Sequence, residues 1–304
     1  MNAGEQAGTI YVAGNVNVDL ILGPLAHWPR VGTETILPHY ELRVGGQAGN
    51  TGLALAALRA RHRVVANMGS DPLGDWLRSA FADGAPNWER SPAAATVTVG
   101  LLHPSGERTF FTSVGHLAGF APEHVLAQLP ERAAPGDVVL ICGVFLSPLL
   151  LAGGRQLLQT LVGRGFATAL DTGWPDGGWD AARPTVEPWL PLVDHVLFNE
   201  LETTALAGRE PLETAMAWFH TRLRPGATLV VKCGADGACA WRADTRVACP
   251  APAVKVIDTI GAGDAFNAGY LFAHAMGRDL PACLQLGVTT ASTAISTSPR
   301  RFVP

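Results

Sequence analysis

The 304-residue sequence lacks several features that mark common classes of protein. It has no run of Lys and Arg, and its formal net charge is -4, so we expect no nucleic-acid partner. It has no GxxxxGK[ST] loop, which argues against a P-loop nucleotide site. No GxGxxG follows the first expected strand, which argues against a dinucleotide-dependent oxidoreductase.

Cysteines and long apolar runs are also scarce. The five cysteines are odd in number and none are spaced as CxxC, so free thiols in a reducing compartment are expected. The longest apolar stretch, around 138–152, is broken by Gly143, Ser147 and Pro148 and is too short to cross a bilayer. The N-terminal MNAGEQAG does not resemble a secretory signal. These observations predict a cytoplasmic protein that does not bind membranes.

The sequence does contain a regular alternation of strand and helix patterns, and 48% of its residues are hydrophobic, enough for a large core. This alternation predicts an α/β fold with a central, mainly parallel sheet flanked by helices. We expect one domain over residues 1–304 with a small appendage. Strands are predicted at 9–13, 64–67, 137–142, 167–171, 195–199 and 228–232, and helices at 50–61, 75–82 and 265–276.

Two β-prone segments, about 33–44 and 96–112, break this alternation. The second contains Pro104-Ser105-Gly106, a typical hairpin turn. We interpret the two segments as a small, discontinuous β-sheet lid. Extra antiparallel strands on the main sheet are the alternative.

A glycine-rich turn precedes the helix expected at 265–276, in the segment Asp258-Thr-Ile-Gly-Ala-Gly-Asp264. The first turn of a helix has unpaired N–H groups and a partial positive charge, and glycines let phosphate oxygens approach them. Gly261, Ala262 and Gly263 therefore predict an anion-binding site. Asp264 is placed to take a proton from an attacking hydroxyl, or it is only the N-cap of the helix, a position that Asp favours.

This turn resembles the D-T-x-G-A-G-D signature of the ribokinase-like (PfkB) carbohydrate kinases. The resemblance implies a Rossmann-like ribokinase fold with a small β-sheet lid and ATP as phosphoryl donor. It implies that Asp264 is the catalytic base and that the amides of Gly261, Ala262 and Gly263 form the anion hole. It also suggests Mg²⁺ as a cofactor and a homodimer formed through the lid.

Two N-terminal segments extend the resemblance, on the side expected to bind the acceptor. Gly45, Gly46 and Asn50 match most of a G-G-x-x-x-N-x-A signature; bare backbone and an amide suit sugar hydroxyls, although a glycine turn capped by Asn is the plain alternative. Asn15 and Asp19 lie in a G-x-x-x-x-D pattern after the first strand. The carboxyl end of a strand in an open α/β sheet is a usual substrate position, and a polar strand end is the alternative.

Two further segments resemble the nucleotide side of the family. Asn199 and Glu202 match N-x-x-E, which implies indirect Mg²⁺ binding, whereas an ordinary acidic helix start would have the same pattern. Lys232, Gly234 and Gly237 follow a strand and resemble the family's nucleotide loop, which could equally be a hairpin turn.

Asp258 matches a position that relatives use for a monovalent cation, which raises K⁺ as a cofactor. The C-terminal part of such a site is not recognisable in the segment 295–301.

The acceptor is less well defined than the reaction. We expect a ribokinase- or fructokinase-like sugar kinase. A nucleoside kinase of the same fold is the alternative, and a non-catalytic ligand-binding homologue is a second one. Residues 113–115, His116, Phe120 or Trp174 are candidates for the acceptor pocket, although a single Trp near a loop is more often a packing residue.

Overall fold

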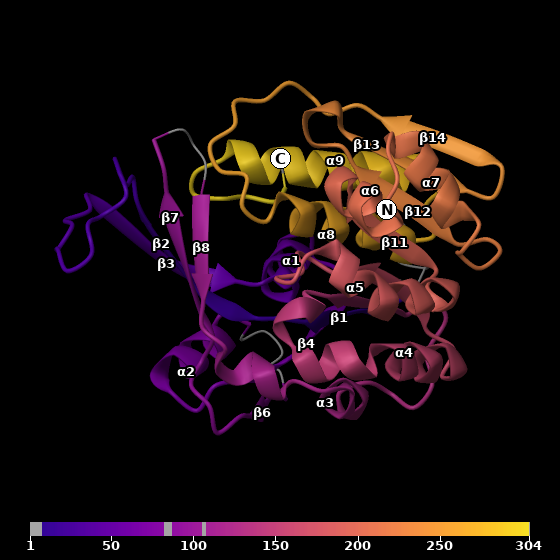
Figure 1. Ribbon diagram of the computed structural model, residues 1–304. Helices are drawn as coiled ribbons and strands as arrows, with labels where there is room; N and C mark the ends of the chain where they lie inside the picture. The colour runs from indigo at the N-terminus through magenta and orange to yellow at the C-terminus, as the bar shows by residue number, and fades with distance from the viewer. Residues whose placement is uncertain (1–7, 82–86, 105–107, 304) are drawn as a thin grey trace.

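The computed structural model describes residues 8–81, 87–104 and 108–303 (Figure 1). Its largest element is an eight-stranded sheet in the order β14-β13-β12-β11-β10-β9-β1-β4. Strands β12, β11, β10, β9, β1 and β4 are parallel to one another. Strand β13 is antiparallel to β12, and β14 is antiparallel to β13. The strands are β1 (Ile10–Gly14), β4 (His62–Val65), β9 (Val138–Cys142), β10 (Ala167–Asp171), β11 (His195–Asn199), β12 (Thr228–Lys232), β13 (Ala238–Arg242) and β14 (Thr245–Cys249).

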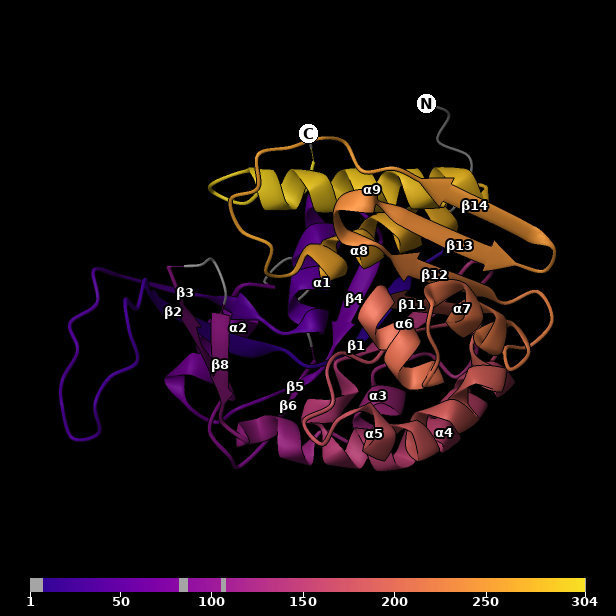
Figure 2. The same cartoon turned by 45° about the horizontal axis from the view of Figure 1, so that its top comes forward.

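Helices cover both faces of this sheet (Figures 1 and 2). One core lies beneath α1, α8 and α9, and the other beneath α3 to α7. Successive residues of the central strands alternate between the two cores, as in Val138 and Val139, so these strands read as continuous apolar runs. The helices are α1 (Gln47–Ala57), α2 (Pro72–Ser79), α3 (Pro122–Ala127), α4 (Pro148–Gly163), α5 (Trp179–Val186), α6 (Glu200–Ala207), α7 (Leu212–His220), α8 (Ala262–Ala275) and α9 (Leu280–Ser296).

A separate four-stranded sheet projects to the left in Figure 1. Its order is β3-β2-β7-β8, with β2 and β7 parallel and the outer pairs antiparallel. The strands are β2 (Asn17–Gly23), β3 (His39–Gly45), β7 (Val97–Leu102) and β8 (Arg108–Thr112). The predicted α/β fold with a separate small sheet is therefore confirmed. Residues 33–38 precede β3, and the predicted turn at 104–106 lies mostly outside the described residues.

Only two residues separate β1 of the large sheet from β2 of the small one, because β1 ends at Gly14 and β2 begins at Asn17. This brings β2 and β3 to the carboxyl ends of the parallel strands, where open α/β sheets bind ligands. A short pair, β5 (Asn67–Met68) and β6 (Glu89–Arg90), lies apart from both sheets. Over the described ranges, no helix combines the length and apolar character needed to cross a bilayer.

Candidate active site

Helix α8 begins directly after the glycine-rich turn's Gly261, three residues earlier than the sequence predicted. Gly261 is the N-cap, with a left-handed φ of 72° that glycine adopts without strain. A β-carbon at Gly261 would lie 3.2 Å from Arg300 Nη1 and from the Asn50 amide. Asp264 lies within the first turn and is not its cap, so the interpretation of Asp264 as only an N-cap is wrong.

Asp264 is buried, and its Oδ2 accepts a hydrogen bond of 3.0 Å from Asn50 Nδ2 on α1. Burial, together with the nearby Asp171 carboxylate, raises the pKa of Asp264 to about 7, while Asn50 and Lys232 oppose this shift. A carboxylate whose pKa lies near neutrality is well matched to general-base catalysis.

The acceptor-side residues of the sequence prediction come together around β2. Asn17 Nδ2 donates to Asp19 Oδ1 over 2.8 Å, and Asn15 Oδ1 accepts from the Gln47 N–H over 3.1 Å. Burial raises the pKa of Asp19 to about 6, although Arg43 and the Asn17 hydrogen bond oppose this.

Gly45 and Gly46 lie so close to Asp19 and Asn15 that neither position has room for a side chain. A β-carbon at Gly45 would lie 2.1 Å from Asp19 Cγ. A β-carbon at Gly46, whose φ is 82°, would lie 2.3 Å from the Asn15 carbonyl oxygen. The glycine pair therefore lets α1 begin directly against the polar end of β2, and Asn50 on this helix reaches Asp264.

A buried ion pair lies beside α8 and contacts Asn267 on that helix. Lys232 Nζ donates to Asp171 Oδ2 over 2.7 Å, and Asn267 Nδ2 donates to the same oxygen over 2.5 Å. Burial alone would lower the pKa of Lys232, but Asp171 and Glu202 raise it above its ordinary value. A β-carbon at Gly263 would lie 3.2 Å from Lys232 Nζ, so this ammonium group faces the glycine-rich turn.

Sequence reasoning did not identify Asp171 and Asn267 as site residues. Asp171 is the last residue of β10, and the rule that substrates bind at carboxyl ends of parallel strands would have identified it. Asn267 gives no such signal, since it lies inside an apolar helical pattern.

Asn199 and Glu202 form a reciprocal cap at the start of α6. Glu202 N–H donates to Asn199 Oδ1, and Asn199 N–H donates to Glu202 Oε2, both over 2.8 Å. The helix-start interpretation therefore holds for this pair. Burial and the neighbouring Asp171 also raise the pKa of Glu202 well above its ordinary value, whereas Lys232 lowers it. Glu202 therefore interacts electrostatically with the Lys232–Asp171 ion pair.

Gly234 and Gly237 lie in the hairpin turn between β12 and β13, in a short 3-10 helix (Gly234–Asp236) and the residue after it. Both have left-handed φ values, 55° and 96°. Gly234 is exposed, and a β-carbon at Gly237 would lie 2.0 Å from the Cys249 carbonyl oxygen. The turn geometry therefore accounts for Gly237.

Asp258 is surrounded by three guanidinium groups. Its carboxylate accepts hydrogen bonds from Arg43 Nη1 over 2.8 Å, Arg108 Nη2 over 2.7 Å and Arg300 Nη2 over 2.8 Å. Burial alone would raise its pKa, but the Ile260 N–H and these arginines hold it below the ordinary value. A carboxylate committed to three cationic groups does not suit a monovalent-cation site.

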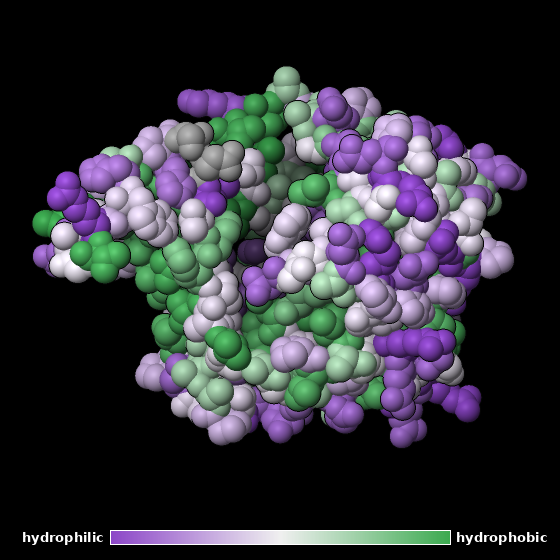
Figure 3. All heavy atoms as spheres, viewed as in Figure 1, coloured by the Kyte–Doolittle hydropathy of each residue, from purple (hydrophilic) through white to green (hydrophobic). Residues whose placement is uncertain are grey.

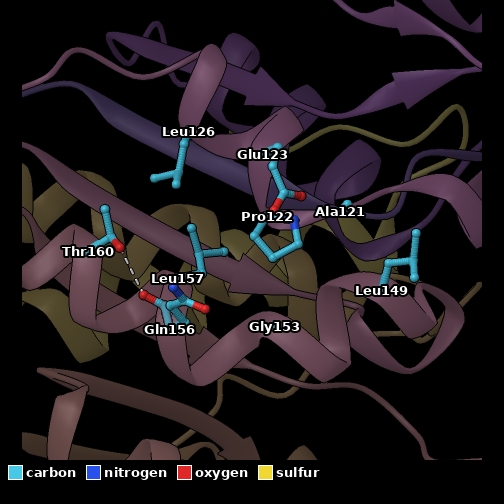
Figure 4. Close-up of a pocket in the computed structure, with 9 residues that line it drawn as sticks. All are labelled: Ala121, Pro122, Glu123, Leu126, Leu149, Gly153, Gln156, Leu157 and Thr160. Carbon is cyan, nitrogen blue, oxygen red and sulfur yellow. Dashed lines mark hydrogen bonds between the residues drawn. The ribbon is translucent and has the colours of Figure 1, made fainter.

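The other pocket candidates lie elsewhere. His116 and Phe120 are fully buried, and His116 Nδ1 accepts from the Thr96 N–H over 2.9 Å, whereas Trp174 is exposed. A pocket of about 310 Å³ between α3 and α4, shown in Figure 4, is lined by polar side chains such as Glu123 and Gln156 as well as by leucines. In contrast, the space-filling view is hollowed between the small sheet and the main body (Figure 3).

The site combines a carboxyl group whose pKa lies near neutrality, the N-terminus of a helix and a lysine side chain. Helix N-termini bind phosphate oxygens, and phosphoryl transfer needs positioning, charge stabilisation and removal of one proton. The fold and the site thus define a phosphotransferase that acts on a hydroxyl group.

Comparisons with known proteins agree with this class. Residues 8–301 match the family described as "pfkB family carbohydrate kinase". A ribokinase of Haemophilus influenzae is 23% identical over 300 residues, which cover 95% of this chain and 92% of that protein. The chain belongs to the pfkB family of carbohydrate kinases and is a phosphotransferase with an alcohol group as acceptor, which confirms the resemblance found in the sequence.

Solved structures share the fold. A ribokinase of Arabidopsis thaliana complexed with ribose and ATP superposes with a TM-score of 0.79 at 21% identity, covering 96% of this chain and 94% of that one. A nucleoside kinase of Burkholderia thailandensis in complex with inosine gives a TM-score of 0.76 at 19% identity, with coverages of 97% and 94%.

We predict that Asp264→Asn lowers kcat by roughly 10² to 10⁴, the usual contribution of a general base, while ligand binding is retained. Because the carboxyl group must lose its proton to act, kcat/KM of the wild type is expected to fall about tenfold per pH unit below the pKa of about 7. Steady-state rates and calorimetry measure both effects.

The matched control for this prediction is Asp180→Asn, because Asp180 is an exposed acid in the first turn of α5. Activity of Asp264→Asn within about threefold of the wild type would remove Asp264 from the mechanism, since a general base contributes far more.

Proposed function

We propose that the protein is an ATP-dependent kinase that transfers the γ-phosphoryl group to a hydroxyl of a sugar or sugar-like small molecule. The observation that carries this proposal is the buried Asp264 carboxylate, which lies in the first turn of a glycine-capped helix. Its pKa is raised to about 7. Since ATP is produced inside cells, a cytoplasmic location suits this reaction.

The mechanism follows from the positions of these groups. Asn15, Asp19, Asn50 and the backbone at Gly45 and Gly46 bind the acceptor hydroxyls. Asp264 takes the proton of the attacking hydroxyl as its oxygen bonds to the γ-phosphorus and the bond to the ADP oxygen breaks. The N–H groups of Gly261, Ala262 and Gly263 stabilise the charge that develops on the transferred group.

The nucleotide side is built from Lys232, Asn199 and the turn with Gly234 and Gly237. Lys232 is held by Asp171 at 2.7 Å and lies beside Gly263, so its charge is available to phosphate oxygens at the glycine-rich turn.

We propose that residues 1–304 form a single kinase domain and that strands β2, β3, β7 and β8 act as its lid. The small sheet borders the hollow seen in Figure 3, and its strand β2 carries Asp19. A lid that covers the acceptor excludes water, which limits hydrolysis of ATP.

The polar lining favours a sugar over a nucleoside. Asn15, Asn17, Asp19 and Asn50 are all buried beside the glycine-rich turn and offer several hydrogen-bonding groups to a small polyol. The aromatic candidates for a base-binding slot, Phe120 and Trp174, are respectively inside the core and on the surface. A nucleoside kinase remains the second candidate, because a nucleoside kinase has the same fold.

In a coupled assay of ADP formation, we predict that a sugar is phosphorylated in preference to adenosine, inosine, cytidine or pseudouridine. Asp19→Ala is expected to raise the acceptor KM roughly tenfold or more, because a charge-assisted hydrogen bond contributes about 1.5–3 kcal/mol. The KM for ATP is the internal control and is expected to change little. A nucleoside preferred about tenfold in kcat/KM, or 1.4 kcal/mol, would favour the second candidate.

The site fits Mg²⁺ bound indirectly. Over the described ranges, no group of three or more His, Cys, Asp or Glu side chains could hold a metal ion by itself. However, Asp171 Oδ1 is buried and has no hydrogen-bond partner among the residues that the structure describes, and the nearby Asp171 charge raises the pKa of Glu202. Asp171 and Glu202 would hold water molecules of a Mg²⁺ ion, whose charge would offset that of the phosphates. K⁺ is not part of the proposal, because the Asp258 carboxylate already accepts hydrogen bonds from three arginines.

We predict that turnover requires Mg²⁺ or Mn²⁺ and that Glu202→Gln raises the metal concentration needed for half-maximal rate. Removing one carboxylate weakens the binding of a hard cation, which prefers oxygen anions. Metal titrations with an EDTA-treated blank measure this. Glu200→Gln is the matched control, since Glu200 is an exposed residue in the same helical turn. Identical titrations for the two variants would reject the role of Glu202.

We also propose a homodimer formed through the lid. The strand register places Leu42, Leu20, Val99 and Phe111 in one row across the face that carries no site residue. Leu42 and Phe111 are about half exposed on it, and Trp28 packs near Phe111 with ring centroids 6.1 Å apart. Burying such an apolar row in a second copy is favourable.

We predict that light scattering gives twice the mass of one chain and that Phe111→Glu shifts the protein to the monomer, because a buried unpaired charge opposes association. Leu149→Glu is the control, since Leu149 is equally exposed but lies on α4. A monomeric wild type, or a dimer unaffected by Phe111→Glu, would contradict this interface.

A further inference from the structure

Three arginines from separate parts of the chain meet beside the acceptor side of the site. Arg43 lies on β3, Arg108 begins β8, and Arg300 follows α9. Each donates to Asp258, and each side chain is less than one-fifth exposed. Sequence reasoning found none of the three, because they are 65 or more residues apart and become neighbours only in the fold.

The cluster has more donors and more positive charge than its neighbours use. A guanidinium group has five N–H donors. Among the described residues, the partners apart from Asp258 are Thr259 Oγ1, 3.0 Å from Arg108 Nη1, and a half-exposed Glu41, 3.8 Å from Arg43 Nη1. Within the same part of the chain, the buried Nε atoms of Arg43 and Arg108 have no partner. Burial and the nearby Arg43 charge lower the pKa of Arg300, in keeping with like charges held close together.

The cluster also adjoins the residues that bind the acceptor. Arg43 is the direct cross-strand partner of Asp19 in the β2–β3 pair, so the two side chains point to the same face of the small sheet. Arg300 Nη1 lies against the anion-hole turn, 3.2 Å from where a β-carbon of Gly261 would be. The positive charge therefore borders the acceptor next to Gly261, whereas Lys232 faces Gly263.

We propose that the acceptor carries an anionic group, a carboxylate or a phosphate, which binds Arg43, Arg108 and Arg300 while its hydroxyl group faces Asp264. Guanidinium groups match the planar geometry of carboxylates and the oxygens of phosphates better than ammonium groups do. Asp258 shares the same donors and holds the three side chains together. This inference rests on the proposed kinase function and specifies its substrate class.

The first test measures kcat/KM for matched acceptors that share a sugar ring and differ in the anionic group: fructose against fructose 1-phosphate and fructose 6-phosphate, and glucose against glucuronate. The best anionic acceptor is expected to exceed its neutral partner at least tenfold. Comparing the phosphorylated sugars with the sugar acid shows whether the anionic group that binds the arginines is a phosphate or a carboxylate. Preference for the neutral member of every pair overturns the proposal.

The second test uses Arg108→Gln, which is expected to lower the anionic-to-neutral ratio of kcat/KM at least tenfold. Arg43→Gln repeats the test if that variant does not fold. Arg246→Gln is the control, because Arg246 is a half-exposed arginine on β14 paired with Glu213 and is expected to leave the ratio unchanged. An equal loss for both acceptors would mean that the arginines only secure Asp258 or the transferred group, and would overturn the proposal.

Calorimetry separates this inference from the function on which it rests. Titrating the same acceptors into the protein without ATP requires no turnover. If no acceptor is phosphorylated, the kinase proposal fails, whatever binds. If acceptors are phosphorylated but anionic ones bind no more tightly than neutral ones, the kinase proposal stands and the arginine site is wrong.

Discussion

The ion pair between Lys232 and Asp171 is the interaction on which the rest of the site depends. Burying charges is costly unless they are paired, and Lys232 is placed among three acidic side chains: Asp171, Glu202 and Asp264. Burial raises the pKa of Glu202 and of Asp264, the Asp171 carboxylate raises both further, and Lys232 lowers both. The pair therefore adjusts the proton affinity of Asp264, the proposed base, which burial has already raised.

The acceptor half of the site depends on steric contact more than on charge. Gly45 and Gly46 let the start of α1 approach β2 at distances that no side chain allows. This contact fixes Asn50 against Asp264 and leaves Asp19 in a buried, polar environment. Asp258 ties the small sheet to the main body, because its carboxylate holds arginines of the small sheet and of the C-terminal segment next to the glycine-rich turn.

Much of the fold could be predicted because its signals are local. Buried parallel strands such as β9 and β12 read as short apolar runs, and the strands predicted at 137–142 and 228–232 agree with them to within a residue. The small sheet was harder to delimit. β2 carries the polar residues Asn17 and Asp19, and the pairing of β2 with β7 joins segments about 80 residues apart.

The sequence by itself determined the glycine-rich turn, its anion-binding capacity and the family resemblance, because these depend on residues adjacent in the chain. Only the tertiary structure decided that Asp264 is not a helix cap and that Asp171 belongs to the site. It also decided that Asp258 binds arginines. Charge interactions act through space, so the pKa of a carboxyl group depends on neighbours such as Lys232 and Asn50, whose approach no local pattern encodes.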